Sequence, residues 1–168
     1  MITDLVQIKR LGEQKRPENE RFRKHLKTHP FPERRLRKIA EEIEDQIDCT
    51  VCANCCRNAT VKLQERDVEK LAKFFRMSPG KFLKQYADED EEQGAILKFT
   101  KEKGCVFLDG NDCTVYEARP SICVDFPHLV RGQGSIHFRM WQFIDRATYC
   151  PIVYNSLEEF KNVSNFPK

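Results

Sequence analysis

The stretch Cys49-Thr50-Val51-Cys52-Ala53-Asn54-Cys55-Cys56 holds four of the eight cysteines of this 168-residue chain. Gaps of two residues let successive thiolates fold back around one ion, which is why such spacings recur in zinc and iron–sulfur sites. Three cysteines at this spacing also begin the cluster motif of bacterial ferredoxins, whose last cysteine precedes a proline, as the remote Cys150 does here. Neighbouring side chains usually point apart, so Cys55 and Cys56 are not expected to bind the same ion. The stretch predicts a metal site.

Four further cysteines complete the candidate ligands, so that the full set is Cys49, Cys52, Cys55, Cys56, Cys105, Cys113, Cys123 and Cys150. Eight thiolates fit either two four-ligand sites or one cluster with spare thiols. Ligation by sulfur alone favours zinc or an iron–sulfur cluster, here a [4Fe–4S] cluster first, over magnesium or calcium. Zinc bound by four cysteines would be structural, whereas an iron–sulfur cluster could be structural, electron-transferring or catalytic.

Structural disulfides are the alternative use of eight cysteines, and the compartment argues against them. Residues 1–16 carry charges throughout and lack the apolar core of a signal peptide. We therefore expect a cytoplasmic protein, in which thiols stay reduced. A formal net charge of +3 is too mild to indicate nucleic-acid binding, and no apolar run reaches the roughly 18 residues that span a membrane.

Hydrophobic periodicity predicts a helix-rich α+β fold, with short strands and irregular loops around the cysteine cluster. We expect a division into an N-terminal arm with a short amphipathic helix (1–32) and a cysteine-cluster metal-binding domain (33–168). Helices are predicted over 33–47, 67–76, 79–86 and 151–163, and strands over 59–63, 95–100 and 136–140. Residues 49–57 are expected to form an irregular ligand loop and the acidic run 88–92 a solvated loop. Turn residues at 110–112 predict a hairpin across which Cys105 and Cys113 face each other.

Some other side chains have two interpretations. Arg119 could donate hydrogen bonds to cluster sulfurs from outside the ligand set, or it could pair with Glu117 or Asp125. His128 is more typical of a packing histidine than of a ligand. Four aromatic residues are expected to belong to the core and to shield the site: Phe107, Tyr116, Phe126 and Trp141.

The ordered motifs resemble the CxxCxxCC cysteine-cluster family of zinc- or iron-chelating domains, some members of which are labelled Fe–S-cluster oxidoreductases. The resemblance covers residues 49 to about 150 and is carried by Cys49-x2-Cys52-x2-Cys55-Cys56, Gly104-Cys105-x-Phe107-Leu108, Cys113-Thr114-Val115-Tyr116-Glu117-x-Arg119-Pro120-x-x-Cys123 and Phe126-Pro127. Val124 departs from the family, since relatives often have a basic residue after that cysteine. Some relatives resemble the methylase that modifies flagellin lysines.

The sequence thus predicts a cytoplasmic protein that holds an iron–sulfur cluster or zinc through cysteine thiolates and could be redox-active. The resemblance implies one alternative, an Fe–S-dependent enzyme like a protein-lysine N-methyltransferase. A structural zinc module for protein interaction is the other. Residues 1–48 could dock a protein partner, whereas nucleic acid and membrane are not expected as partners.

Overall fold

The computed structural model describes residues 1–167, which divide into two compact units. The first unit combines residues 1–48 with 126–168, and the second comprises 49–125. The helices outnumber the strands, which are short antiparallel pairs, so the prediction of a helix-rich α+β fold is confirmed. The boundary expected at residue 32 stays a prediction. Within residues 1–167, no helix is both long and apolar enough to cross a membrane.

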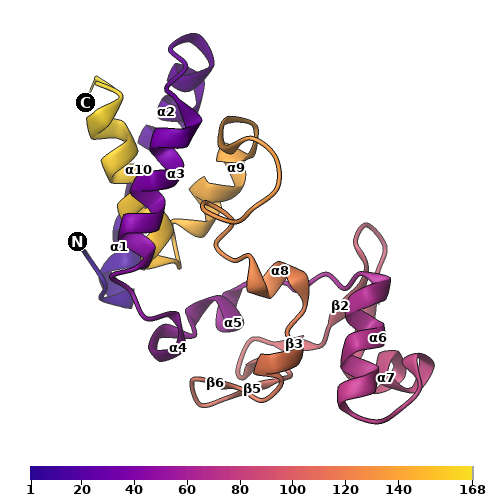
Figure 1. The fold of residues 1–168 in the computed structure, drawn as a ribbon. Coiled ribbons are helices and arrows are strands. Elements are labelled where there is room, and N and C mark those ends of the chain that lie inside the picture. Colours follow the sequence, from indigo (N-terminus) through magenta and orange to yellow (C-terminus); the bar gives the residue numbers. More distant parts are fainter. Residues whose placement is uncertain (168) are drawn as a thin grey trace. The chain divides into compact units, whose positions relative to one another are not determined.

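The first unit is a helical bundle made from both ends of the chain. It contains α1 (Leu5–Gln14), α2 (Arg16–Thr28), α3 (Glu33–Glu44), α9 (Ile136–Arg146) and α10 (Pro151–Val163). The C-terminal helix α10 packs against α3, α1 and α9, and α2 packs against α9 (Figure 1). Large side chains from every one of these helices are buried, among them Ile8, Phe22, Leu36, Phe143 and Phe160. Hydrophobic burial between sequence-distant helices therefore holds the unit together.

Helix α9 corrects the strand predicted over 136–140. Ile136, Met140 and Phe143 are fully buried, and their spacing of four and three residues is that of a helix face. Ser135 begins the helix as its N-cap, because its hydroxyl accepts a hydrogen bond from the His137 amide at 3.2 Å. The alternation of apolar residues over 136–140 was too short to distinguish a strand from this longer pattern. Trp141, expected in the core, is 56% exposed on the same helix.

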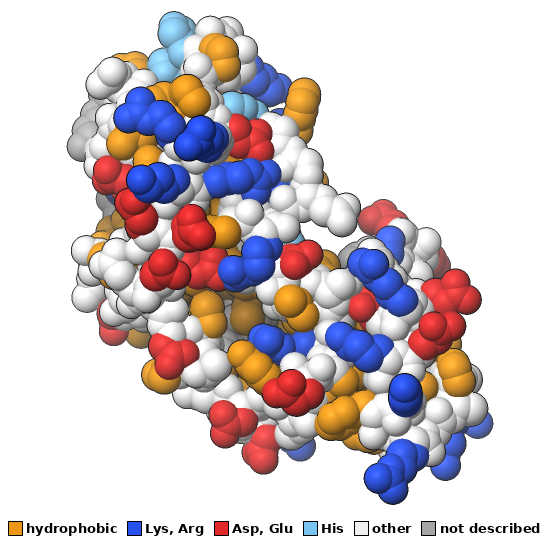
Figure 2. Space-filling model, in the orientation of Figure 1, with side chains coloured by type: hydrophobic (Ala, Val, Ile, Leu, Met, Phe, Trp, Pro, Cys, Tyr) orange, Lys and Arg blue, Asp and Glu red, His pale blue; other side chains and the backbone are white. Residues whose placement is uncertain are grey.

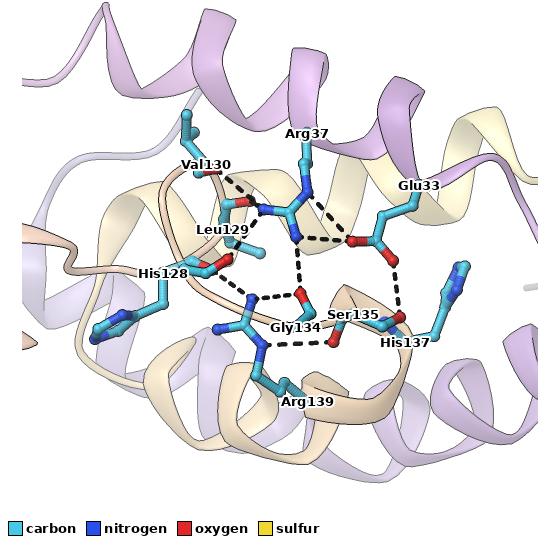
Figure 3. Close-up of polar contacts among 10 residues, drawn as sticks. Glu33, Arg37, His128, Leu129, Val130, Gly134, Ser135, His137 and Arg139 are labelled. Carbon is cyan, nitrogen blue, oxygen red and sulfur yellow. Dashed lines mark hydrogen bonds and ion pairs between the residues drawn. The ribbon is translucent and has the colours of Figure 1, made fainter.

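Two arginines fix the loop that precedes α9 (Figure 3). The Arg37 guanidinium donates to the carbonyl oxygens of three loop residues, Leu129, Val130 and Gly134, at 3.1, 3.0 and 2.8 Å. Arg139 donates to the His128 carbonyl at 3.0 Å from the other side. Glu33 accepts from Arg37 at 2.7 Å and from the Ser135 hydroxyl at 2.7 Å. The loop carbonyls thus obtain charge-assisted partners instead of secondary-structure bonds.

A buried lysine links α2 to α10. Lys161 is only 3% exposed, and its ammonium pairs with Glu18 and Glu158 and donates to the Asn19 side-chain oxygen at 3.0 Å. Three acceptors for three N–H donors satisfy the charge inside the unit.

The surface charge is mixed in sign, with acidic and basic side chains interspersed on the face in Figure 2. This distribution matches the small net charge and gives no large basic patch on that face.

The second unit begins with two short helices where an irregular loop was predicted, α4 (Cys49–Cys52) and α5 (Asn54–Asn58). Ala53 separates them with a left-handed φ of 44°. It then contains α6 (Glu65–Phe74), α7 (Pro79–Tyr86) and α8 (Ser121–Val124), and a 3₁₀ turn over Tyr116–Ala118. Its strands are β1 (Ala87–Asp90), β2 (Gly94–Leu97), β3 (Phe99–Thr100), β4 (Gly104–Cys105), β5 (Leu108–Asp109) and β6 (Asp112–Cys113). Each cysteine motif therefore lies on a short element.

Strand pairing corrects two further expectations. The first three residues of the acidic run lie in β1, which pairs with β2, so the run is half of a hairpin rather than a loop, although its side chains are mostly exposed, as expected. Asp90 closes the turn by accepting from the amides of Glu92 and Gln93 at 3.0 and 2.9 Å. Cys105 pairs with Phe99, and Cys113 with Leu108, so the two cysteines are in different hairpins.

An aromatic core supports these hairpins. The rings of Phe75, Phe82, Tyr86 and Phe107 lie with centroids 4.9 to 6.4 Å apart. Phe107 is 4% exposed, as predicted, whereas Tyr116 is 46% exposed and does not belong to the core. These rings belong to the larger hydrophobic core of the second unit, against which Cys105, Cys113 and Cys123 pack.

Candidate metal centre

The centre is built where α5 meets β4. Gly104 makes the approach feasible: a Cβ at this position would lie 2.7 Å from the Cys56 carbonyl oxygen and 3.1 Å from the Arg57 Cα. Its φ of +81° also favours glycine over any residue with a side chain. Because Gly104 directly precedes Cys105, this contact brings two cysteines that are 49 positions apart in the sequence (105 minus 56) into one region.

Four thiols of the second unit act on one another, and we call them the thiol set: Cys56, Cys105, Cys113 and Cys123. The pKa of Cys123 is raised to about 12, mainly by burial and in part by the neighbouring thiols of the set. Burial likewise raises the pKa of Cys105 to about 11, with contributions from Cys56 and Cys113. The pKa of Cys113 is raised in the same way. Like charges close together in an apolar setting produce this pattern, and a cation between them would reverse it.

Cys56 differs from the other three members. The hydrogen bond with the Cys55 thiol, with sulfurs 4.0 Å apart, is the main reason that the pKa of Cys56 falls to about 7. Burial opposes this change, while the charges of Arg57 and Arg119 assist it. The two adjacent thiols thus lie close together rather than pointing apart. Cys56 is consequently the member of the set best able to present a thiolate at neutral pH.

Two members of the set share a local backbone arrangement. The sulfur of Cys105 accepts a hydrogen bond from the amide of Phe107, and the sulfur of Cys113 accepts one from the amide of Val115. Both donors lie two residues after the cysteine. Amide donors directed at sulfur stabilise the thiolate form, as the surrounding groups of metal-bound cysteines do.

Arg119 lies near this set. Its positive charge lowers the pKa of Cys56, Cys113 and Cys123. The guanidinium lies 3.6 Å from the centre of the Tyr116 ring, and its Nε donates to the Tyr116 carbonyl at 3.0 Å. Among residues 1–167, Arg119 forms no ion pair with Glu117 or Asp125. The positive charge of Arg119 therefore acts on the thiol set, and its hydrogen bonding to the sulfurs of a bound cluster stays a prediction.

Sequence reasoning missed two residues that build the site. The Arg57 guanidinium donates to the Cys52 carbonyl at 3.2 Å and to the Gly110 carbonyl at 2.6 Å, which joins the opening cysteine stretch to the β5–β6 hairpin. Its position directly after the vicinal cysteines was the only available signal. Asp67, 3% exposed, accepts from the Ser121 amide at 2.9 Å and so holds α8, which carries Cys123. Nothing local in the sequence connects these two segments.

The other cysteines are placed as follows. Cys49 and Cys52 are the first and last residues of α4, with Cys49 exposed and Cys52 half-buried. Cys150 belongs to the first unit, where it is buried as the N-cap of α10. Within residues 1–167, no three Cys, His, Asp or Glu side chains already surround a common point as ligands of one ion do. The donor chemistry of the thiol set nevertheless fits zinc or an iron–sulfur cluster, because both are bound by thiolates supported by amide and arginine donors.

Comparison with known proteins agrees with this chemistry. A family model described as "CxxCxxCC: Putative zinc- or iron-chelating domain" matches residues 48–151. No curated protein and no solved structure matches the chain. The matched range includes the entire second unit and both ends of the cysteine series. The chain therefore belongs to the CxxCxxCC family of zinc- or iron-chelating domains.

Proposed function

We propose that this protein binds an iron–sulfur cluster or zinc through cysteine thiolates in the cytoplasm, with a [4Fe–4S] cluster favoured. The observation that carries the proposal is the thiol set, in which four cysteines from four separate elements lie close enough to influence one another's protonation. Four sulfur ligands match the number that either group needs. The ferredoxin-like spacing of Cys49, Cys52 and Cys55, which lie outside the thiol set, favours iron over zinc at the further site that these three cysteines could form.

Each part of the site has a separate role in this proposal. Cys56, Cys105, Cys113 and Cys123 are the first ligands, and Cys49, Cys52 and Cys55 are candidates for a further site within the second unit. Cys150 belongs to the first unit and is a separate candidate ligand. Arg57 and Arg119 offset the thiolate charge, and the amides of Phe107 and Val115 orient two sulfurs. When bound, a cluster would supply one-electron transfer, whereas zinc would supply a structural cross-link. The aromatic core excludes water from one side, which for a cluster would influence the potential.

The test is metal and acid-labile sulfide analysis of protein purified without oxygen. Iron with equal sulfide and an absorption band at about 400 nm would support a cluster. Zinc without sulfide would assign the site to a structural module. A protein that contains neither metal, and whose unfolding does not respond to added zinc or to cluster reconstitution, would refute the proposal.

Two matched variants localise the metal. Cys105→Ser removes one sulfur of the thiol set and is expected to lose the bound metal. Val106→Ser changes the neighbouring residue, which is 40% exposed, and is expected to retain it. If both variants keep the full metal content, Cys105 is not a ligand and the thiol set is wrong as assigned.

A further inference from the structure

A pair of histidines outside the cysteine series has the geometry of a second metal site. His25 lies in the last turn of α2, and His29 is the residue that ends this helix. Their rings are parallel within 8°, with centroids 4.4 Å apart. Residues four apart on a helix lie on the same face, and two histidines at this spacing bind zinc in known helical motifs. Figure 2, in the orientation of Figure 1, shows histidine side chains at the surface in the region where Figure 1 has the connection between α2 and α3.

Hydrogen bonds of Thr28 determine which nitrogen of His29 is available. The Thr28 hydroxyl donates to the His25 carbonyl at 3.1 Å, so its one proton is already used. It also lies 2.9 Å from Nδ1 of His29 and must therefore accept a proton from that nitrogen. Nδ1 of His29 is consequently the N–H, and Nε2 carries the lone pair. Metal-binding histidines are typically fixed in this way, by a partner on the other ring nitrogen.

Two more features lie beside this position. The Phe166 ring packs edge-on against the His25 ring, with centroids 5.3 Å apart, and so borders the pair on one side. The site also lies at the C-terminal end of a 13-residue helix, where the helix dipole favours positive charge. Lys27 is an exposed positive charge in the same turn and repels a cation at this position.

We propose that His25 and His29 form a surface site for a first-row divalent cation such as Ni²⁺, Cu²⁺ or Zn²⁺, with Thr28 positioning the His29 ring. Imidazole nitrogen suits these ions, and hard cations such as Mg²⁺ are not expected to bind. The stacked rings hold their lone pairs in parallel planes, so the half-buried His25 and the exposed His29 would each turn out of the stack to direct both Nε2 atoms at one ion, with water completing its coordination. This site shares no residue with the thiol set and does not depend on the metal bound there.

The test uses the full chain, loaded first with zinc so that the thiols are occupied, then desalted with a weak chelator to remove zinc from the histidine pair, and finally titrated with Ni²⁺. Nickel is paramagnetic, so the expected result is selective broadening of the His25 and His29 imidazole resonances, with one equivalent bound by calorimetry. His25→Gln and His29→Gln should each abolish this binding. Lys27→Gln is the matched control in the same turn and should bind at least as well as the unmodified protein.

Thr28 supplies a sharper test of the positioning. Thr28→Val keeps the shape of the side chain and removes the hydroxyl, and should weaken Ni²⁺ binding by about tenfold or more. Thr28→Ser should restore it. The proposal is overturned if His25→Gln or Thr28→Val binds Ni²⁺ as the unmodified protein does, or if Ni²⁺ broadens His128 and His137 to the same extent.

Discussion

Replacing Gly104 with alanine tests whether the contact between α5 and β4 builds the metal centre. Two costs add at this position. An alanine at a φ of +81° carries a strain of roughly 1–2 kcal/mol. Its Cβ would lie 2.7 Å from the Cys56 carbonyl oxygen, which is well inside the ordinary C···O contact of about 3.3 Å.

The second cost is that of overpacking, which is typically about 1–3 kcal/mol. Both neighbours of the new methyl group are backbone atoms, so no side chain can rotate away from it. We therefore expect Gly104→Ala to destabilise the second unit by about 2–5 kcal/mol. Separating β4 from α5 by several tenths of an ångström should also weaken metal binding, because metal–ligand distances tolerate only about 0.2 Å.

Gly110→Ala is the matched control. Gly110 has a similar φ of +60°, but an added Cβ there meets no atom within 4 Å. It should therefore show the strain alone, about 1–2 kcal/mol. Urea unfolding followed by circular dichroism gives the difference in free energy, and amide exchange over 99–125 shows where it arises. Equal losses in the two variants, or a change below about 0.5 kcal/mol for Gly104→Ala, would refute the close approach as the cause.

Three other predictions concern charged side chains. Lys161→Met leaves Glu18 and Glu158 without their shared cation, and should lower the unfolding free energy of the protein by about 2–4 kcal/mol, measured by urea denaturation; no loss would mean that the ammonium is not needed. Burial tends to raise the pKa of Glu33, but hydrogen bonds from Ser135 and Arg37 outweigh it and lower the pKa below 4.5. The stabilisation by Glu33 is thus present above about pH 4.5 and lost as the pH falls through the folded pKa, so Glu33→Gln should flatten the pH dependence of stability between about pH 5 and 3; an unchanged acid profile would contradict this. Asp67→Asn should cost about 1–3 kcal/mol because it loosens the α8 N-terminus, and should speed alkylation of the α8 thiol; an unchanged alkylation rate would refute that link.

The sequence predicted well those elements whose signals are local. The pair Ser78-Pro79 predicts the start of a helix, and the structure confirms α7 over Pro79–Tyr86. The Ser78 hydroxyl accepts a hydrogen bond from the Lys81 amide at 3.3 Å. The helix over 151–163 is also confirmed with the predicted bounds. Helix caps and apolar periodicity act within a few residues, so they can be read without the fold. The strand predicted over 136–140, which is part of α9, was wrong because the apolar alternation there is too short to distinguish a strand from a helix.

The sequence also identified the candidate cysteines, because their spacing and the surrounding motifs are local features. It did not show which of these cysteines interact. Cys56, Cys105, Cys113 and Cys123 come from segments that meet through Gly104, Arg57 and Asp67, and each of these contacts joins residues far apart in the chain. The spacing of the thiols thus indicated zinc or iron chelation. The tertiary structure alone decided which sulfurs share one environment, because burial, charge and close backbone approach depend on distances in space rather than along the chain.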